Sequence, residues 1–154
     1  MKDQATIGMT DKVDMETVQL MREAVPENPE AALLIRQMIS FGATYDHVVD
    51  GDEWTTDNVH GMVEILLHGL WMNKLYTDNI ASFLPIIMNG IHSWKFAENN
   101  PEYRLKVNDI LSELGCAILY VTGGMTRLNG WGGKWRRQIL ILMKDSDNNT
   151  TGDK

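Results

Sequence analysis

Apolar side chains recur along most of the chain at spacings of three and four residues, the period of one face of an α-helix. The clearest case follows Asn28-Pro29, where an asparagine cap and a proline at the first helical position favour a helix start. Its apolar face consists of Leu34, Met38, Phe41, Tyr45 and Val48. Asp50-Gly51-Asp52 then supplies residues typical of a helix end and a turn. We therefore predict a long helix between these two signals.

Two helices flank this one in the sequence. A short helix is predicted from Asp14 to Ala24, and a third runs from the caps at residues 55 to 57 to about Tyr76. The third helix carries one apolar stripe and further apolar residues on another side: Val59, Met62, Val63, Leu66 and Leu70, then Leu67 and Trp71. A helix that is apolar around most of its circumference is usually buried, so we expect it at the centre of a bundle.

The remaining pattern predicts two more helices and a short last one. Asp78 can cap the fourth helix, and Pro85 should bend it or split its first turn. The fifth starts at residues 100 to 102 and stops at Gly123-Gly124. A glycine-rich hinge over residues 129 to 133 then precedes a helix of about residues 134 to 143. No segment alternates as a strand would, so the predicted fold class is all-α.

Length and composition fit one domain. The 154 residues are 44% hydrophobic, enough for a real core. We predict a bundle of five to six helices over residues 13 to 144, with flexible ends at residues 1 to 12 and 145 to 154. No apolar run approaches the roughly 18 residues of a membrane span. A lone Cys116 and an N-terminus without a secretion signal favour a cytoplasmic protein.

The net charge of −7 is unevenly distributed. Residues 1 to 113 hold 18 acidic and 8 basic side chains, whereas residues 114 to 144 hold five bases and no acid. This asymmetry could direct an acidic face of one subunit towards the basic segment of another. Self-association or a protein partner is therefore expected.

A possible metal site lies around the turn between the second and third helices. His60, Glu64 and His68 are spaced four apart, so they share one side of a helix. Asp46 and Asp50 are also four apart, near the end of the preceding helix. If the two helices pack antiparallel, these five side chains could offer oxygen and nitrogen ligands to a divalent metal. The alternative is a polar turn between core helices with solvated histidines.

Familiar catalytic motifs are missing. The order Asp46-His47 is the reverse of the His-Asp pair of one phosphohydrolase class, and His-Glu-x-x-His is absent. Cys116 stands between Gly115 and Ala117 in a helical stretch, which is typical of a small packed side chain. The sequence therefore assigns no catalytic residue and no cofactor, with a divalent metal as the alternative.

A basic and aromatic segment near the C-terminus is a candidate partner-binding surface. Its candidate residues are Trp131, Lys134, Trp135, Arg136 and Arg137. Bases and exposed aromatic rings together can bind nucleic acid by phosphate pairing and stacking, or lie on an anionic membrane surface. The alternative is a last helix that packs on the bundle and leaves its bases in water.

Scattered positions also resemble a known group of proteins. These positions are the acidic turn at residues 45 to 52, then His60, Glu64, Asn73, Tyr76, Leu84-Pro85, Asn89, Trp94 and Ala97. Over about residues 30 to 122 the chain resembles small all-helical proteins of tailed bacteriophages and prophages. The resemblance implies a helical fold and a viral setting, in the host cytoplasm or the virion.

Three functions are consistent with these patterns. The first is a non-catalytic phage-type accessory or assembly protein that acts through protein contacts. The second is a small metal-dependent hydrolase of a nucleotide or phosphorylated substrate, with the five-residue metal set as its site. The third is nucleic-acid binding through the basic aromatic segment.

Overall fold

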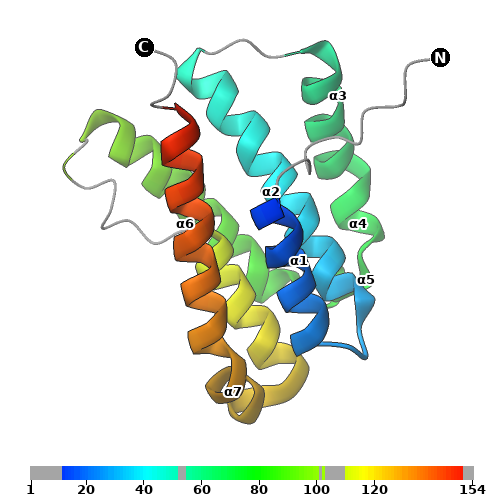
Figure 1. Cartoon of the computed structure of the whole chain (residues 1–154). Coiled ribbons are helices and arrows are strands. Elements are labelled where there is room, and N and C mark those ends of the chain that lie inside the picture. Colours follow the sequence, from blue (N-terminus) through cyan, green and yellow to red (C-terminus); the bar gives the residue numbers. More distant parts are fainter. Residues whose placement is uncertain (1–11, 52–54, 101, 103–109, 151–154) are drawn as a thin grey trace.

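The computed structural model describes residues 12–51, 55–100, 102 and 110–150, without the side chains of residues 50 and 145–150. Within these ranges all regular structure is helical, which confirms the predicted all-α class. The elements are α1 (Lys12–Ala24), α2 (Pro29–Asp50), α3 (Thr56–Glu64), the π-helical segment η1 (Ile65–Gly69), α4 (Leu70–Met72), α5 (Lys74–Asp78), α6 (Ile80–Asn99) and α7 (Ile110–Thr150). Since α3, η1 and α4 follow one another without a gap, they form one continuous helix (Figure 1).

Local capping sets the limits of α2 and the start of α3, as predicted. The Asn28 side chain accepts a hydrogen bond from the Glu30 N–H at 3.1 Å, and Pro29 is the first helical residue. Gly51 ends α2 with a φ of 73°, a left-handed conformation that suits glycine. Thr55 caps α3 by accepting from the Asn58 N–H at 3.2 Å. These signals act within one turn, so the sequence alone reveals them.

The C-terminal element α7 is a helical hairpin. It contains one non-helical residue, Gly124, with φ 65° and ψ −161°. In Figure 1 the yellow part of α7 descends to this point and the orange and red part returns beside it. We call residues 110–123 the first limb and residues 125–150 the second limb. The predicted stop at Gly123-Gly124 is thus confirmed.

The predicted hinge over residues 129 to 133 is wrong, because these residues are helical. Only Gly124 takes a positive φ within α7, and the second limb packs from Leu128 onward against the core. The second limb also continues to Thr150, past the predicted end at residue 143. The predicted start of this helix pair at residues 100 to 102 falls largely outside the described residues, as do 1–11 and 151–154 of the predicted flexible ends.

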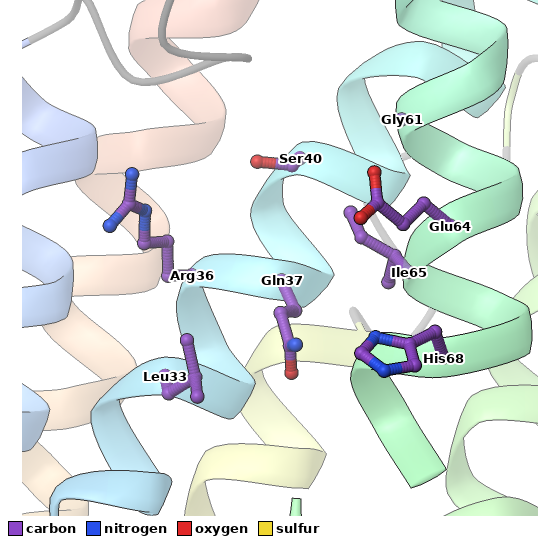
Figure 2. A pocket seen from close by; sticks show the side chains of 9 residues that line it. Leu33, Arg36, Gln37, Ser40, Gly61, Glu64, Ile65 and His68 are labelled. Atoms are coloured by element: carbon purple, nitrogen blue, oxygen red, sulfur yellow. The ribbon is translucent and has the colours of Figure 1, made fainter. Parts of the chain in front are cut away.

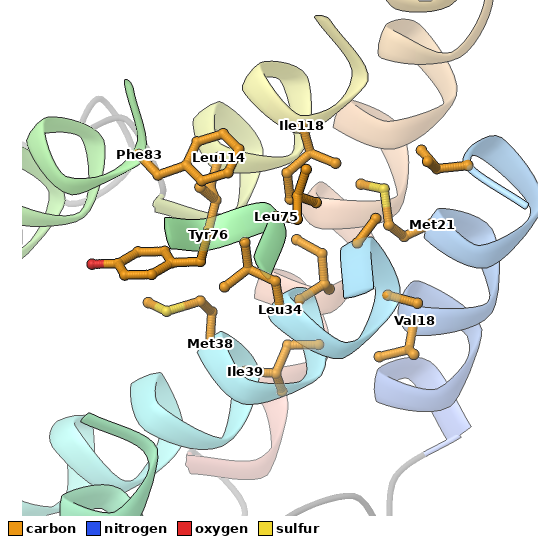
Figure 3. Close-up of a cluster of buried hydrophobic side chains, with 14 of the residues drawn as sticks. Val18, Met21, Leu34, Met38, Ile39, Leu75, Tyr76, Phe83, Leu114 and Ile118 are labelled. Atoms are coloured by element: carbon orange, nitrogen blue, oxygen red, sulfur yellow. The ribbon is translucent and has the colours of Figure 1, made fainter. Parts of the chain in front are cut away.

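The core lies where α1, α2 and both limbs of α7 meet, with α6 packed against α7 (Figure 3). The predicted face of α2 is confirmed for Leu34, Met38 and Phe41, which are at most 4% exposed. Tyr45 is half-buried, while Val48 at the helix end is 40% exposed. Other members of the core are Val18, Met21, Phe83, Ile87, Ile110, Leu114, Ile118, Leu119, Trp135 and Ile139.

The continuous helix α3–η1–α4 is peripheral, so the prediction that it is central is wrong. Of its predicted apolar stripe only Leu70 is buried, and Leu67 is 75% exposed. The helix packs mainly against α2 and lies at one edge of the molecule in Figure 1. The two limbs of α7 occupy the central position beside α2 instead.

Two further expectations for the middle of the chain are corrected. The third helix does not run unbroken to Tyr76, because Asn73 leaves the helical conformation and caps α5. Asp78 is the last residue of α5, and Asn79 precedes α6 in the position predicted for Asp78. Pro85 lies inside α6, which is not split there.

Candidate functional site

A groove of about 220 Å³ runs between α2 and the α3–η1 part of the neighbouring helix (Figure 2). Polar and apolar side chains line it together: Leu33, Arg36, Gln37 and Ser40 from α2, and Gly61, Glu64, Ile65, His68 and Gly69 from α3 and η1. Helical spacing explains the set, since each helix presents residues three or four apart. The groove therefore combines a carboxylate, an imidazole, an amide, a hydroxyl and a guanidinium.

One wall of the groove is the π-helical segment. The N–H of Leu70 donates to the carbonyl of Ile65, five residues earlier, which widens this turn. Such single π-turns inside α-helices are rare and often occur at functional sites. Here three of the lining residues, Ile65, His68 and Gly69, belong to the wide turn.

The amide of Gln37 lies against this wall. A Cβ at position 69 would stand 2.6 Å from Nε2 of Gln37, so glycine there leaves room for the amide. Oε1 of Gln37 is buried and accepts no hydrogen bond from the described residues. A buried acceptor without a donor costs about 1 to 3 kcal/mol.

The structure brings together only part of the predicted metal set. Glu64 and His68 line the groove, whereas Asp46 and His60 are exposed and do not. Within the described residues, no three His, Cys, Asp or Glu side chains come together in a group that could hold a metal ion. The side chain of Asp50 is not described, so the full five-residue set stays a prediction.

The partners of Glu64 and His68 across the groove come from an earlier part of α2 than the sequence suggested. They are Arg36, Gln37 and Ser40, which precede Asp46 by more than one helical turn. Their spacing of one and three residues marks a polar strip on a largely apolar stretch of α2, and this was the signal that the sequence offered. Its relation to Glu64 depends on how the two helices are placed, which spacing does not reveal.

In the basic aromatic segment, Trp135 is a core residue. It is 1% exposed, and its Nε1 donates to the carbonyl of Leu111 at 3.0 Å, from the second limb of α7 to the first. A Cβ on Gly115 would overlap the indole ring, so glycine lets the limbs approach closely. Burial removes this ring from the surface that a nucleic acid or a partner could reach.

The other members of this segment lie nearer the surface. Trp131 is half-buried, with Nζ of Lys134 4.7 Å from its ring centroid. Arg136 donates to Glu113 at 2.9 Å and to Ser112 at 3.1 Å, and the hydrogen bond to Glu113 raises the pKa of Arg136. Arg136 therefore helps to join the two limbs, while Lys134 and Arg137 are exposed.

Cys116 is buried in the first limb of α7, and burial raises the pKa of its thiol. A raised pKa keeps the thiol protonated at neutral pH, and a thiol is a much weaker nucleophile than a thiolate. The side chain accordingly acts as a small packing residue.

A second candidate surface is the outer face of α3–η1–α4, which we define as Val63, Leu66, Leu67 and Trp71. These side chains are between 40% and 75% exposed. Val63, Leu67 and Trp71 are spaced four apart and Leu66 follows Val63 by three residues, so the four lie on one side of the helix. Glu64 and His68, which line the groove, lie on another side. The Trp71 ring packs edge-on against Tyr76 with centroids 6.5 Å apart. Contiguous exposed apolar surface of this kind marks interaction sites.

Comparison with known proteins adds no relative: no family model, no curated protein and no solved structure matches the chain. Among the helices of the described ranges, none is long and apolar enough to cross a bilayer. The likeness to phage and prophage proteins, drawn from scattered residues, stays a prediction.

Proposed function

We propose that this chain is a non-catalytic helical protein that acts through protein contacts, and that the outer face of α3–η1–α4 binds a second copy of the chain. The observation that carries the proposal is the exposure of the outer face, where Leu67 is 75% and Trp71 59% exposed. Aromatic side chains are enriched at the centres of protein interfaces. Covering them would remove apolar surface from water, which favours association.

The charge distribution favours a second copy as the occupant. Two chains of net charge −7 repel each other, so they associate best through surfaces that carry no charge. No Asp, Glu, Lys or Arg occurs from Ile65 to Asn73. In a two-fold contact this segment meets itself, and an uncharged apolar segment is complementary to itself.

We also propose a biological role for the chain in a viral setting. The resemblance to helical phage and prophage proteins supports an accessory or assembly role in the host cytoplasm or the virion. Self-association through one face is compatible with such a role, because most soluble oligomers are symmetric homo-oligomers.

The test is the mass of the protein in solution. The double variant Leu67→Glu/Trp71→Glu places two carboxylates in the outer face, and Leu140→Glu is the matched control on the second limb of α7, where Leu140 is 57% exposed. We expect sedimentation to give a dimer for the original chain and for Leu140→Glu, and a monomer for the double variant. A monomeric original chain, or a dimer that survives both carboxylates, would overturn the proposal.

A further inference from the structure

We propose that the exposed side of the second limb of α7 binds the surface of a lipid bilayer that contains anionic headgroups. This side, which we call the basic face, consists of Lys134, Arg137, Leu140, Ile141 and Lys144. It shares no residue with the outer face of α3–η1–α4, so the proposal goes beyond the dimer contact and does not depend on it.

Helical spacing places these five residues along one side of the second limb. Lys134, Arg137, Ile141 and Lys144 follow one another at intervals of three, four and three residues, and Leu140 lies next to Ile141. All five are exposed, whereas the buried residues of this limb lie on the side that packs on the core. In Figure 1 the limb, in orange and red, runs along the molecule from the hairpin turn. The basic face extends over about 15 Å of this helix.

The three bases of this face carry charge that the fold does not use. No Asp or Glu occurs from residue 114 to residue 144, where five bases occur. Two of these five are paired with acids elsewhere in the chain, since Arg127 contacts Glu27 and Arg136 contacts Glu113. Among the described residues, the other three bases form no ion pair. Their charges are therefore available to an anionic partner.

The partner also has to cover apolar surface, because Leu140 is 57% and Ile141 51% exposed between the bases. A second copy of the chain does not fit here, since a two-fold contact would place bases against bases. Nucleic acid fits poorly as well. Its phosphates would lose water against the two aliphatic side chains, and the ring of Trp135, which could stack on bases, is buried.

An anionic bilayer surface offers both kinds of contact. Helices that lie in the bilayer interface combine Lys and Arg with apolar side chains that enter the boundary between headgroups and acyl chains. Leu140 and Ile141 enter this boundary, while the long stems of Arg137 and Lys144 let their charges remain among the headgroup phosphates. Each base close to such a surface strengthens binding by about fivefold.

The experiment is co-sedimentation of the full chain with lipid vesicles. One set of vesicles contains phosphatidylserine and phosphatidylcholine in equal parts, and the other contains phosphatidylcholine alone. We expect the chain to bind the first set at low salt and not the second. Binding should weaken as salt rises from about 0.01 to 0.15 M, because the Debye length falls from about 30 to 8 Å.

Two double variants test the two components of the face. Arg137→Gln/Lys144→Gln removes two positive charges, and Leu140→Glu/Ile141→Glu replaces the apolar contact by two carboxylates. Each should weaken binding to the phosphatidylserine vesicles by about tenfold or more. All four side chains are exposed, and circular dichroism verifies that both variants fold.

Matched controls change exposed residues on α5 and α6. Lys74→Gln/Lys95→Gln removes the same charge as the first variant, and Leu84→Glu/Met88→Glu adds the same charge as the second. Both should bind the vesicles as the original chain does, because neither touches the basic face.

Other outcomes overturn the inference. Equal binding to both sets of vesicles, binding to neither, or unchanged binding of Leu140→Glu/Ile141→Glu would each do so. A chain that binds a duplex DNA oligonucleotide and no vesicles would assign the face to nucleic acid instead. The solution mass of the same variants separates this result from the dimer proposal, since both variants of the basic face should stay dimeric.

Discussion

At the scale of single residues, Asn73 joins two distant parts of the chain. Its side-chain oxygen accepts from the Tyr76 N–H at 2.9 Å, and its Nδ2 donates to the carbonyl of Glu30 at 3.0 Å. The Glu30 carboxylate in turn accepts from the N–H groups of Lys74 and Leu75. A buried amide with both its oxygen and its nitrogen bonded thereby fixes the start of α5 on the start of α2.

We predict that Asn73→Ala lowers the free energy of unfolding by about 1 to 3 kcal/mol, because it leaves buried backbone groups without partners. Asn99→Ala is the control, since Asn99 is exposed and its Nδ2 donates to the Lys95 carbonyl within its own helix. That change should stay within about 0.5 kcal/mol. Urea denaturation measures both, and equal effects would contradict the prediction.

Trp135 shows why a residue type does not settle its role. In the sequence, Trp135 follows two glycines and stands between basic residues, a setting that is typical of an exposed indole that stacks on nucleic-acid bases. Its burial follows from the return of the second limb of α7 along the first, where Gly115 leaves a gap that the indole fills. The two residues are too far apart in the sequence for any local pattern to connect them.

At the scale of elements, the hairpin of α7 depends on one backbone conformation. With φ 65° and ψ −161°, Gly124 lies in a region that is essentially restricted to glycine. A Cβ at this position would meet no neighbouring atom, so the restriction comes from the backbone alone. The turn therefore requires glycine even though space is available.

Gly124→Ala should accordingly lower the free energy of unfolding by about 1 to 3 kcal/mol. Gly130→Ala is the matched control within the second limb, where a Cβ also meets no neighbouring atom and φ is not positive. It should raise stability by about 0.5 to 1 kcal/mol, because alanine favours a helix interior over glycine. The two changes in urea midpoint should have opposite signs, and a shared sign would refute this account of the turn.

At the scale of the whole molecule, exposed bases and the exposed apolar face lie on different elements. The exposed bases Lys134 and Arg137 lie on the second limb of α7, and the outer face of α3–η1–α4 carries no formal charge between Ile65 and Asn73. Two modes of self-association are thus conceivable. One is apolar and face to face, as proposed, and the other pairs an acidic with a basic surface.

Salt distinguishes these two modes. We predict that dimerisation strengthens between about 0.01 and 0.15 M salt, because the Debye length falls from about 30 to 8 Å and the repulsion between two chains of charge −7 is screened. Sedimentation equilibrium at both salt concentrations measures the constant. Weaker dimerisation at the higher concentration would instead indicate pairing of acidic and basic surfaces.

The sequence by itself determined the all-α class, the caps of α2 and α3, the stop at Gly124 and the buried face of α2. These features depend on residues within one or two turns of each other, and such interactions leave a periodic or local signal. It also placed Glu64 and His68 on one side of a helix.

Only the tertiary structure decided which helix is central and what faces Glu64. Periodicity shows that a face is apolar but not which element covers it, so the peripheral place of α3–η1–α4 and the burial of Trp135 depend on the return of α7. The groove likewise depends on the register of two helices, which brings Gln37 and Gly69 together. Contacts between residues distant in the sequence set these features, and no local pattern records them.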